Sequence, residues 1–201
     1  MLREIQICWG KLLTSDLLIT GVVERMFFQQ TEPDLVRSAM AGDRAAFAEL
    51  LRPEYRTALR LAYGLLQHVD EAEDAVQEAS FSAWKRIGNL REGSGLRPWF
   101  LGIVANQCRA VKRDRWWSVT KAEPIEGEAP ETDIALSIDL RRALRRLGHD
   151  ERLVLVLRYY LDMPFEEIAT TLGISPKAAR TRVERAVHRL RPIMRVQGAA
   201  V

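Results

Sequence analysis

The chain has 201 residues, of which 47% are hydrophobic and 28% charged, with a formal net charge of +3. This composition suffices for one large or two small folded domains and excludes wholesale disorder. No apolar run reaches the roughly 18 residues of a membrane span, and the N-terminal residues lack a signal-peptide cleavage pattern, so we expect a cytoplasmic protein. The two cysteines, Cys8 and Cys108, form no CxxC or Cys/His cluster, which argues against a metal site and a disulfide framework.

Helical periodicity dominates residues 33–117, and strand signals are weak. A first long helix is predicted by apolar residues that recur every three to four positions. They are Phe47, Leu50, Leu51, Ala58, Leu59, Ala62 and Leu65. We expect a second helix over 70–87 and a third over 98–114, where Pro98 suits the first turn.

Two segments have the composition of loops, and a third is strongly basic. Residues 89–97 contain two glycines, which predicts a loop. Residues 118–137 combine prolines and a glycine with many acidic side chains, which is typical of a linker. Residues 177–195, by contrast, are rich in arginine and have Glu184 as their single acid. The chain therefore carries a basic C-terminal helix behind an acidic connector.

The segment 164–190 has the pattern of a helix-turn-helix. One face of a short helix is marked by Phe165, Ile168, Ala169 and Leu172. Gly173 then suits the left-handed conformation that ends a helix, and Ser175–Pro176 combines a capping side chain with proline at the first helical position. The buried stripe of the following helix is predicted to be Ala179, Val183, Ala186, Val187 and Leu190.

The outward face of this second helix is basic, which favours DNA binding. In a helix-turn-helix the second helix enters the major groove, where its N-terminal half meets base edges. Arginine can bind guanine bidentately for about 1–3 kcal/mol of discrimination, and each neutralised phosphate releases counterions. The alternative is that the arginines are only solvated and matched to the helix dipole. That alternative accounts for the charge but not for the turn at 173–176.

The predicted helix 70–87 has two distinct faces. Its interior stripe consists of the small residues Ala72, Val76, Ala79 and Ala83. A second stripe carries Asp74, Gln77, Glu78, Phe81 and Lys85. An aromatic residue within a polar stripe indicates a partner surface; the alternative is that Phe81 merely packs beside Trp84.

The chain resembles the extracytoplasmic-function (ECF) branch of the sigma-70 family in three segments, which occur in the family's order. They are DEAEDAVQEASFSAW (70–84), RPWFLGIVANQCRAVKRDR (97–115) and EEIATTLGISPKAARTRVERAVHRL (166–190). The resemblance covers roughly 33–195. It implies an all-α fold of two small helical domains, a sigma domain 2-like bundle and a sigma domain 4-like helix-turn-helix, joined by the acidic linker.

The implied organisation is a region 2-like domain at 33–117, an acidic linker at 118–137 and a region 4-like domain at 138–195. A short tail follows at 196–201. Residues 1–32 form an N-terminal extension of unknown role, which matches nothing in the family and is either a genuine appendage or an over-extended start.

The function implied by the resemblance is that of a sigma factor. Such a factor binds core RNA polymerase, recognises the minus-35 and minus-10 promoter elements and promotes DNA melting. It performs no enzymatic reaction and needs no cofactor or metal. The expected partners are core polymerase, through its β′ clamp and β subunit, promoter DNA and an anti-sigma factor.

The resemblance also assigns roles to individual residues. Docking on core polymerase is implied for Asp74, Gln77, Glu78 and Phe81. The residues matched to the minus-10 element are Asn106, Arg109, Lys112 and Arg113. The residues matched to the minus-35 element are Lys177, Arg180, Thr181, Arg182, Glu184 and Arg185.

Asn106 falls where the family reads a base flipped out of the non-template strand, and the loop 90–97 falls where the family walls that pocket. Asn106, Arg109 and Arg113 are spaced i, i+3 and i+7, so they share one helix face. An amide can pair with a base edge, and arginine can stack on or neutralise a single strand. Since opening a duplex costs about 1.4 kcal/mol per stacked step, capture of an extruded base offsets part of that free energy.

Three features depart from the family pattern. Ala178 and Ala179 stand where family recognition helices usually carry a small hydroxyl and a β-branched residue, which puts the details of minus-35 recognition in question. Pro164 replaces a common capping Ser or Thr. Trp116 and Trp117 end the region 2-like block, where they could stack on DNA or pack against the linker or core.

Two other functions fit parts of the sequence. A helix-turn-helix regulator that does not bind core polymerase would share the C-terminal block, but it has no need for the surface at 74–81 or for Asn106. An enzyme would need a nucleophile–base pair, a phosphate-binding loop or a metal cluster. None is evident in the sequence, whose three histidines, His68, His149 and His188, are scattered.

Overall fold

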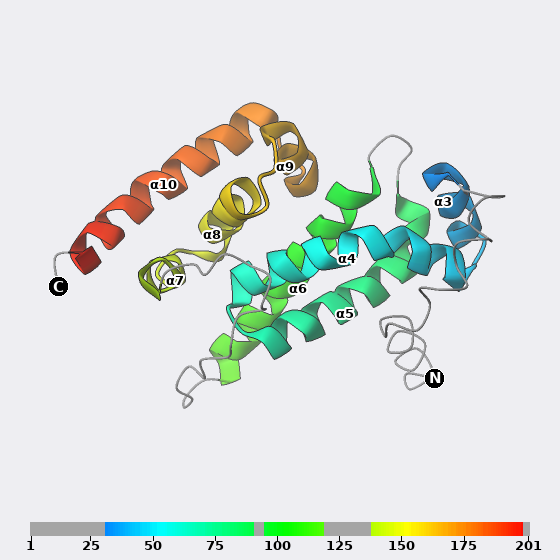
Figure 1. The fold of residues 1–201 in the computed structure, drawn as a ribbon, viewed down its shortest axis with the longest axis horizontal. Coiled ribbons are helices and arrows are strands. Elements are labelled where there is room, and N and C mark those ends of the chain that lie inside the picture. Colours follow the sequence, from blue (N-terminus) through cyan, green and yellow to red (C-terminus); the bar gives the residue numbers. More distant parts are fainter. Residues whose placement is uncertain (1–30, 91–94, 119–137, 199–201) are drawn as a thin grey trace, which may run out of the picture.

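The computed structural model describes residues 31–90, 95–118 and 138–198. Within these ranges the chain is helical, which confirms the predicted all-α class (Figure 1). The N-terminal bundle consists of α3 (Glu32–Met40), α4 (Arg44–Leu66), α5 (Val69–Arg86) with the 3-10 turn Ile87–Asn89, and α6 (Leu96–Ser118). The C-terminal helices are α7 (Ile138–Arg145), α8 (His149–Leu155) with the π-helical turn Val156–Tyr160, α9 (Phe165–Leu172) and α10 (Pro176–Gly198). The predicted extension and acidic linker lie almost entirely outside the described residues.

The predicted helices of the bundle are present, with shifted ends. The helix expected over 98–114 begins at Leu96 and continues to Ser118. Pro98 therefore takes the third position of α6, still within the first turn, where backbone amides have no acceptor in the helix. Trp116 and Trp117 belong to this helix, and their side chains lie outside the described part. None of the helices in the described ranges is long and apolar enough to cross a membrane.

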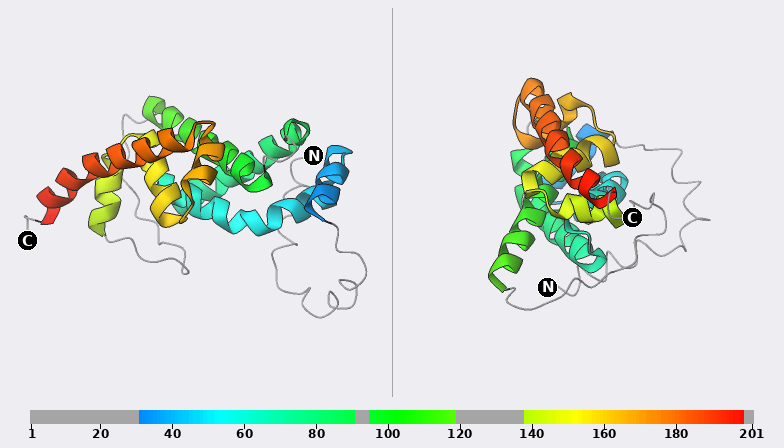
Figure 2. Two further views of the ribbon diagram at one scale, coloured as in Figure 1. Left: turned by 90° about the horizontal axis from the view of Figure 1, so that it is seen from above. Right: turned by 90° about the vertical axis from the view of Figure 1, so that its left-hand side faces the viewer.

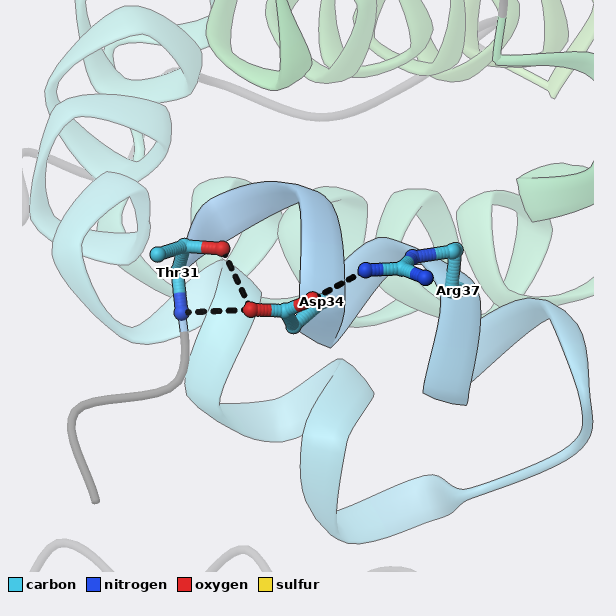
Figure 3. A network of polar contacts seen from close by, with 3 residues as sticks. All are labelled: Thr31, Asp34 and Arg37. Atoms are coloured by element: carbon cyan, nitrogen blue, oxygen red, sulfur yellow. Dashed lines mark hydrogen bonds and ion pairs between the residues drawn. The ribbon is translucent and has the colours of Figure 1, made fainter.

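The first helix, α3, is fixed by a polar network at its start (Figure 3). Asp34 Oδ2 accepts hydrogen bonds from the Thr31 hydroxyl at 2.6 Å and from the Thr31 amide at 3.3 Å, while Oδ1 pairs with Arg37. The hydroxyl hydrogen bond is the main cause that holds the pKa of Asp34 below its ordinary value. A negative charge here also satisfies the positive end of the helix dipole.

Small side chains allow α4, α5 and α6 to pack closely. The stripe predicted on α5 is buried at Ala72, Val76, Ala79 and Ala83. Trp84 of α5 meets Phe47 of α4 edge to face, with ring centroids 5.1 Å apart, a favourable aromatic geometry. Cys108 is buried between the helices, and burial raises the pKa of its thiol to about 12. It is therefore an inert core residue, as expected of a buried thiol.

The C-terminal helices pack directly on the bundle, so the two predicted units share one core (Figure 1; Figure 2). The residues that they contribute to it include Leu153, Val156, Leu157, Met163 and Ile168. Close approach depends on Gly64 of α4, where an added Cβ would lie 2.8 Å from Val156 Cγ1. A second, smaller core joins α7, α8 and α10.

Arg152 is the largest fully buried side chain and connects the two units. It is 2% exposed and donates to the carbonyl oxygens of Leu65 at 2.7 Å, Leu144 at 2.8 Å and Leu147 at 3.4 Å. These carbonyls lie at or just beyond the ends of α4 and α7, where helices leave acceptors unsatisfied. Burial lowers the pKa of Arg152 to about 10, which leaves the guanidinium protonated at neutral pH.

Arg152→Ala is expected to lower the free energy of unfolding by about 3 kcal/mol, because it removes three hydrogen bonds from a charged donor and leaves their acceptors buried. Urea denaturation of the full chain measures this change. Arg142→Ala, at an exposed position of α7, is the matched control and should change stability by less than about 0.5 kcal/mol. Equal effects in both variants would contradict the structural role given to Arg152.

Candidate nucleic-acid interface

The helix-turn-helix is built as the sequence predicts. Gly173 adopts the left-handed conformation with φ of 64° after α9, and Pro176 is the first residue of α10. The Ser175 hydroxyl accepts a hydrogen bond from the Ala178 amide at 3.2 Å, which confirms the predicted cap. Pro164 precedes α9 without a side-chain cap. The α10 stripe is buried at Ala179, Val183 and Ala186 and half-buried at Val187 and Leu190.

This packing turns the residues matched to the minus-35 element outward on α10. The exposed ones are Lys177, Arg180, Arg182, Glu184 and Arg185. Thr181 is half-buried, and its hydroxyl donates to the Lys177 carbonyl at 3.0 Å. The helix therefore presents charged donors and one acid on a surface that its own core leaves free.

Phe165 has a contact that the sequence did not predict. Its ring lies 4.8 Å from the Arg180 guanidinium and 5.1 Å from that of Arg158. Arginine above an aromatic face is held by cation–π attraction. The helical spacing identified Phe165 only as an apolar face residue, because a periodic pattern does not reveal which cation meets the ring.

The face predicted on α6 is also formed. Asn106, Arg109 and Arg113 are exposed on this helix, and Lys112 is half-buried. The Asn106 amide has no hydrogen-bond partner among the described residues. Arg109 pairs with Asp150 of α8, with 2.5 Å between Nη2 and Oδ1. The structure thus brings an acid of the C-terminal helices onto this face, which the sequence did not predict.

A second acid of the C-terminal helices meets the start of α6. Arg97 Nε lies 2.9 Å from Glu167 Oε1 of α9 and 3.7 Å from Glu54 Oε2 of α4. Burial raises the pKa of the Glu54 carboxyl, against the opposing effect of Arg97. Of the loop predicted to wall the Asn106 pocket, residues 91–94 lie outside the described part, and Arg97 belongs to the first turn of α6.

The surface matched to polymerase docking lies on α5. Asp74, Gln77 and Glu78 are exposed, and Phe81 is half-buried with Lys85 Nζ 4.0 Å from its ring centroid. Trp84 instead turns toward Phe47 in the core. The aromatic residue of the polar stripe therefore keeps part of its ring accessible to a partner.

A cavity of about 680 Å³ opens where α6, α8 and α10 meet, lined in part by Arg109, His149 and Arg189. Both imidazole nitrogens of His149 are buried without a hydrogen-bond partner among the described residues. Burial, reinforced by Arg109 and Lys112, lowers the pKa of His149 from 6.5 to about 4, so the ring is neutral at pH 7.

His149 is expected to make stability fall as the pH drops from about 6.5 to about 4. In this window the His149 imidazole is protonated in the unfolded chain but neutral in the folded chain. The free energy of unfolding therefore decreases as the pH decreases. Between pH 7 and pH 5 its share is at most about 2 kcal/mol.

Urea denaturation at these two pH values should show a smaller loss for His149→Gln than for the wild type. His188→Gln, on the exposed side of α10, should keep the wild-type loss. An unchanged loss in His149→Gln would show that the imidazole is not held neutral.

Comparison with known proteins agrees with both halves of this architecture. The family model described as Sigma-70 region 2 matches residues 50–118, and that described as Sigma-70, region 4 matches residues 137–190. The ECF RNA polymerase sigma factor SigM of Mycobacterium tuberculosis is 31% identical over 169 residues, covering 81% of this chain and 84% of its own. The RNA polymerase sigma-H factor of Pseudomonas aeruginosa is 28% identical, covering 80% and 92%.

Two solved structures share the fold. The sigma factor RpoE of Bartonella quintana, solved in complex with the anti-sigma factor NepR, has a TM-score of 0.62 and 25% identity, covering 75% of this chain and 97% of its own. CnrH, solved with the cytosolic domain of CnrY, has a TM-score of 0.59 and 21% identity, covering 81% and 96%.

Proposed function

The chain belongs to the ECF branch of the sigma-70 family and is an RNA polymerase sigma factor, and from this premise we propose which surface carries each part of its activity. The observation that carries the proposal is that matched residues are exposed on two separate helices, α6 and α10, and that a third helix, α5, exposes the matched polar residues Asp74, Gln77 and Glu78. A regulator confined to region 4 would leave the region 2 match unexplained.

We assign residues 33–117 to a region 2 unit and 138–195 to a region 4 unit, joined by the linker 118–137. The two family matches support this division, because they leave the linker between them. The chain acts by binding rather than by catalysis: free energy from the captured strand offsets the melting of promoter DNA. A factor that acts on RNA polymerase works in the cytoplasm.

The α5 surface is the proposed site for core polymerase. Three exposed polar residues precede the half-buried Phe81 on the same helix stripe, at spacings of seven, four and three residues, and Lys85 Nζ lies over its ring. A partly accessible aromatic residue inside a polar rim is a common interface arrangement, since the ring supplies apolar contact and the rim supplies orientation. The family resemblance places the β′ clamp opposite this surface. An anti-sigma factor is a further proposed partner, supported by the complex in which the related RpoE was solved.

The α10 face is the proposed reader of duplex DNA at the minus-35 element. Arg185 is exposed on the N-terminal half of this helix, which is the part that meets base edges when a recognition helix enters the major groove. The guanidinium of Arg180, another of the proposed contacts, lies over the ring of Phe165. This cation–π contact restricts the Arg180 side chain before DNA binds. Ala178 offers no hydroxyl in the first turn and Ala179 is buried in the core, so we assign the recognition to the exposed charged residues.

Arg185→Ala is expected to reduce the preference for the minus-35 element by about 1–3 kcal/mol, since a bidentate arginine–base contact is lost. Transcription in vitro from promoters with intact and scrambled minus-35 sequences measures this preference. Arg191→Ala, an exposed position beyond the predicted contacts on α10, should retain it. An unchanged footprint over the minus-35 element in Arg185→Ala would count against the assignment.

The α6 face is the proposed reader of the melted strand. Asn106 is exposed, and its side-chain amide makes no hydrogen bond within the described ranges; Arg109 and Arg113 lie one and two turns along the same face. An amide with two donors and an acceptor can pair with the edge of an extruded base, while the arginines neutralise the strand.

Asn106→Ala is expected to reduce open-complex formation by roughly tenfold, the equivalent of one lost amide–base pair, and to leave core binding unchanged. Permanganate reactivity of thymines at the minus-10 element reports melting, and gel filtration with core polymerase reports binding. Gln107→Ala removes the same chemical group from the neighbouring, half-buried position and should melt DNA normally. Loss of core binding in Asn106→Ala would contradict the role of this residue as a reader of the melted strand.

A further inference from the structure

Glu184 is the single acid in the basic stretch 177–195, which contains the proposed minus-35 face of α10. Its side chain is exposed and lies in the first half of the helix, the part that meets base edges in a helix-turn-helix. DNA phosphates repel a carboxylate here whatever the sequence of the duplex. The acid therefore weakens binding to all sequences alike, unless a neighbouring cation neutralises it or it makes a contact of its own.

No neighbouring cation neutralises Glu184 in the part of the chain that the structure describes. Arg180 is the expected partner, because it lies four residues before Glu184 on the same helix face. Its guanidinium instead lies 4.8 Å from the centroid of the Phe165 ring of α9. Within residues 31–90, 95–118 and 138–198, the Glu184 carboxylate makes neither a hydrogen bond nor an ion pair.

The Phe165 ring is a well-fixed partner for Arg180. It stands at the start of α9, which packs against α10 (Figure 1), and it touches both apolar cores. On the ring also lies Arg158, 5.1 Å from the centroid, whose Nη1 donates to the Met163 carbonyl at 2.9 Å. A cation–π contact contributes more than an exposed ion pair at spacing i, i+4, so the ring keeps Arg180 away from Glu184.

An unpaired carboxylate on a recognition helix selects among the four bases by its hydrogen-bonding chemistry. The ionised group only accepts hydrogen bonds. In the major groove cytosine presents the N4 amino group as a donor, whereas guanine and thymine present acceptors that repel a carboxylate. Adenine places the acceptor N7 beside its amino group. Cytosine is therefore the base that a carboxylate fits best.

We propose that Glu184 reads a cytosine in the minus-35 element, and that Phe165 is the positioning residue that keeps Glu184 available by holding Arg180. This inference rests on the proposed role of the α10 face and goes beyond it by naming a base and the residue that selects it. Repulsion by the phosphates acts on every sequence, and only a cytosine opposite Glu184 offsets it. The acid thus disfavours the other bases as much as it favours cytosine.

The test uses the full chain with core RNA polymerase and a promoter library in which all four bases occur at every minus-35 position. Sequencing the transcripts gives the base preference at each position. The wild type should prefer cytosine over thymine at one position by at least about fivefold. Glu184→Ala should lose this preference at that position. Glu184→Gln should exchange it for adenine, because an amide pairs bidentately with adenine N6 and N7.

Three further variants separate base reading from charge and from folding. Glu166→Gln removes the same charge from an exposed position in the first turn of α9 and should leave every base preference unchanged. Phe165→Leu should lower the cytosine preference by about twofold, because the released Arg180 can then pair with Glu184. The preference should return in Phe165→Leu/Arg180→Ala, and Phe165→Tyr, which keeps an aromatic face, should retain it.

Unchanged base preferences in Glu184→Ala and Glu184→Gln, with or without an even rise in transcription from all sequences, would overturn the reading role of Glu184. A cytosine preference that Phe165→Leu leaves intact would overturn the positioning role of Phe165. In both cases a minus-35 preference that depends on Arg185 keeps the proposed function of the α10 face in place. A wild-type holoenzyme without any minus-35 preference would contradict that function itself.

Discussion

The buried guanidinium of Arg152 is the interaction on which the arrangement of this protein depends. It ties carbonyls near the ends of α4 and α7 to α8, and it lies under the junction of the N-terminal bundle and the C-terminal helices. The two residues before it in α8 form ion pairs with both neighbouring helices: Asp150 pairs with Arg109 of α6, and Glu151 pairs with Arg189 of α10 at 2.7 Å. One buried cation thus positions the helix whose acids pair with both α6 and α10.

The charges of the two units meet at α6. Arg97 and Arg109 of this helix pair with Glu167 of α9 and Asp150 of α8. Ion pairs of this kind contribute little to stability when they are exposed. The apolar core that the two units share is therefore the larger contribution to their packing.

Local structure was predictable from the sequence because its signals are local. The turn at Gly173 and Ser175–Pro176, the α5 stripe and the shared face of Asn106 and Arg109 follow from periodicity and capping chemistry. The packing of the two units was not predictable, because the Gly64–Val156 contact joins residues far apart in the chain, and periodicity shows only that a face is apolar. Arg152 was missed for a related reason: an arginine in a charged sequence is ordinarily exposed.

Reconstitution with core RNA polymerase tests whether this chain directs transcription from promoters. The full chain is mixed with core enzyme and a promoter library, and the transcripts made in vitro are sequenced. We expect a stable complex with core polymerase and transcripts that start at fixed positions downstream of shared minus-35 and minus-10 sequences. A chain that neither binds core polymerase nor yields promoter-dependent transcripts would contradict it.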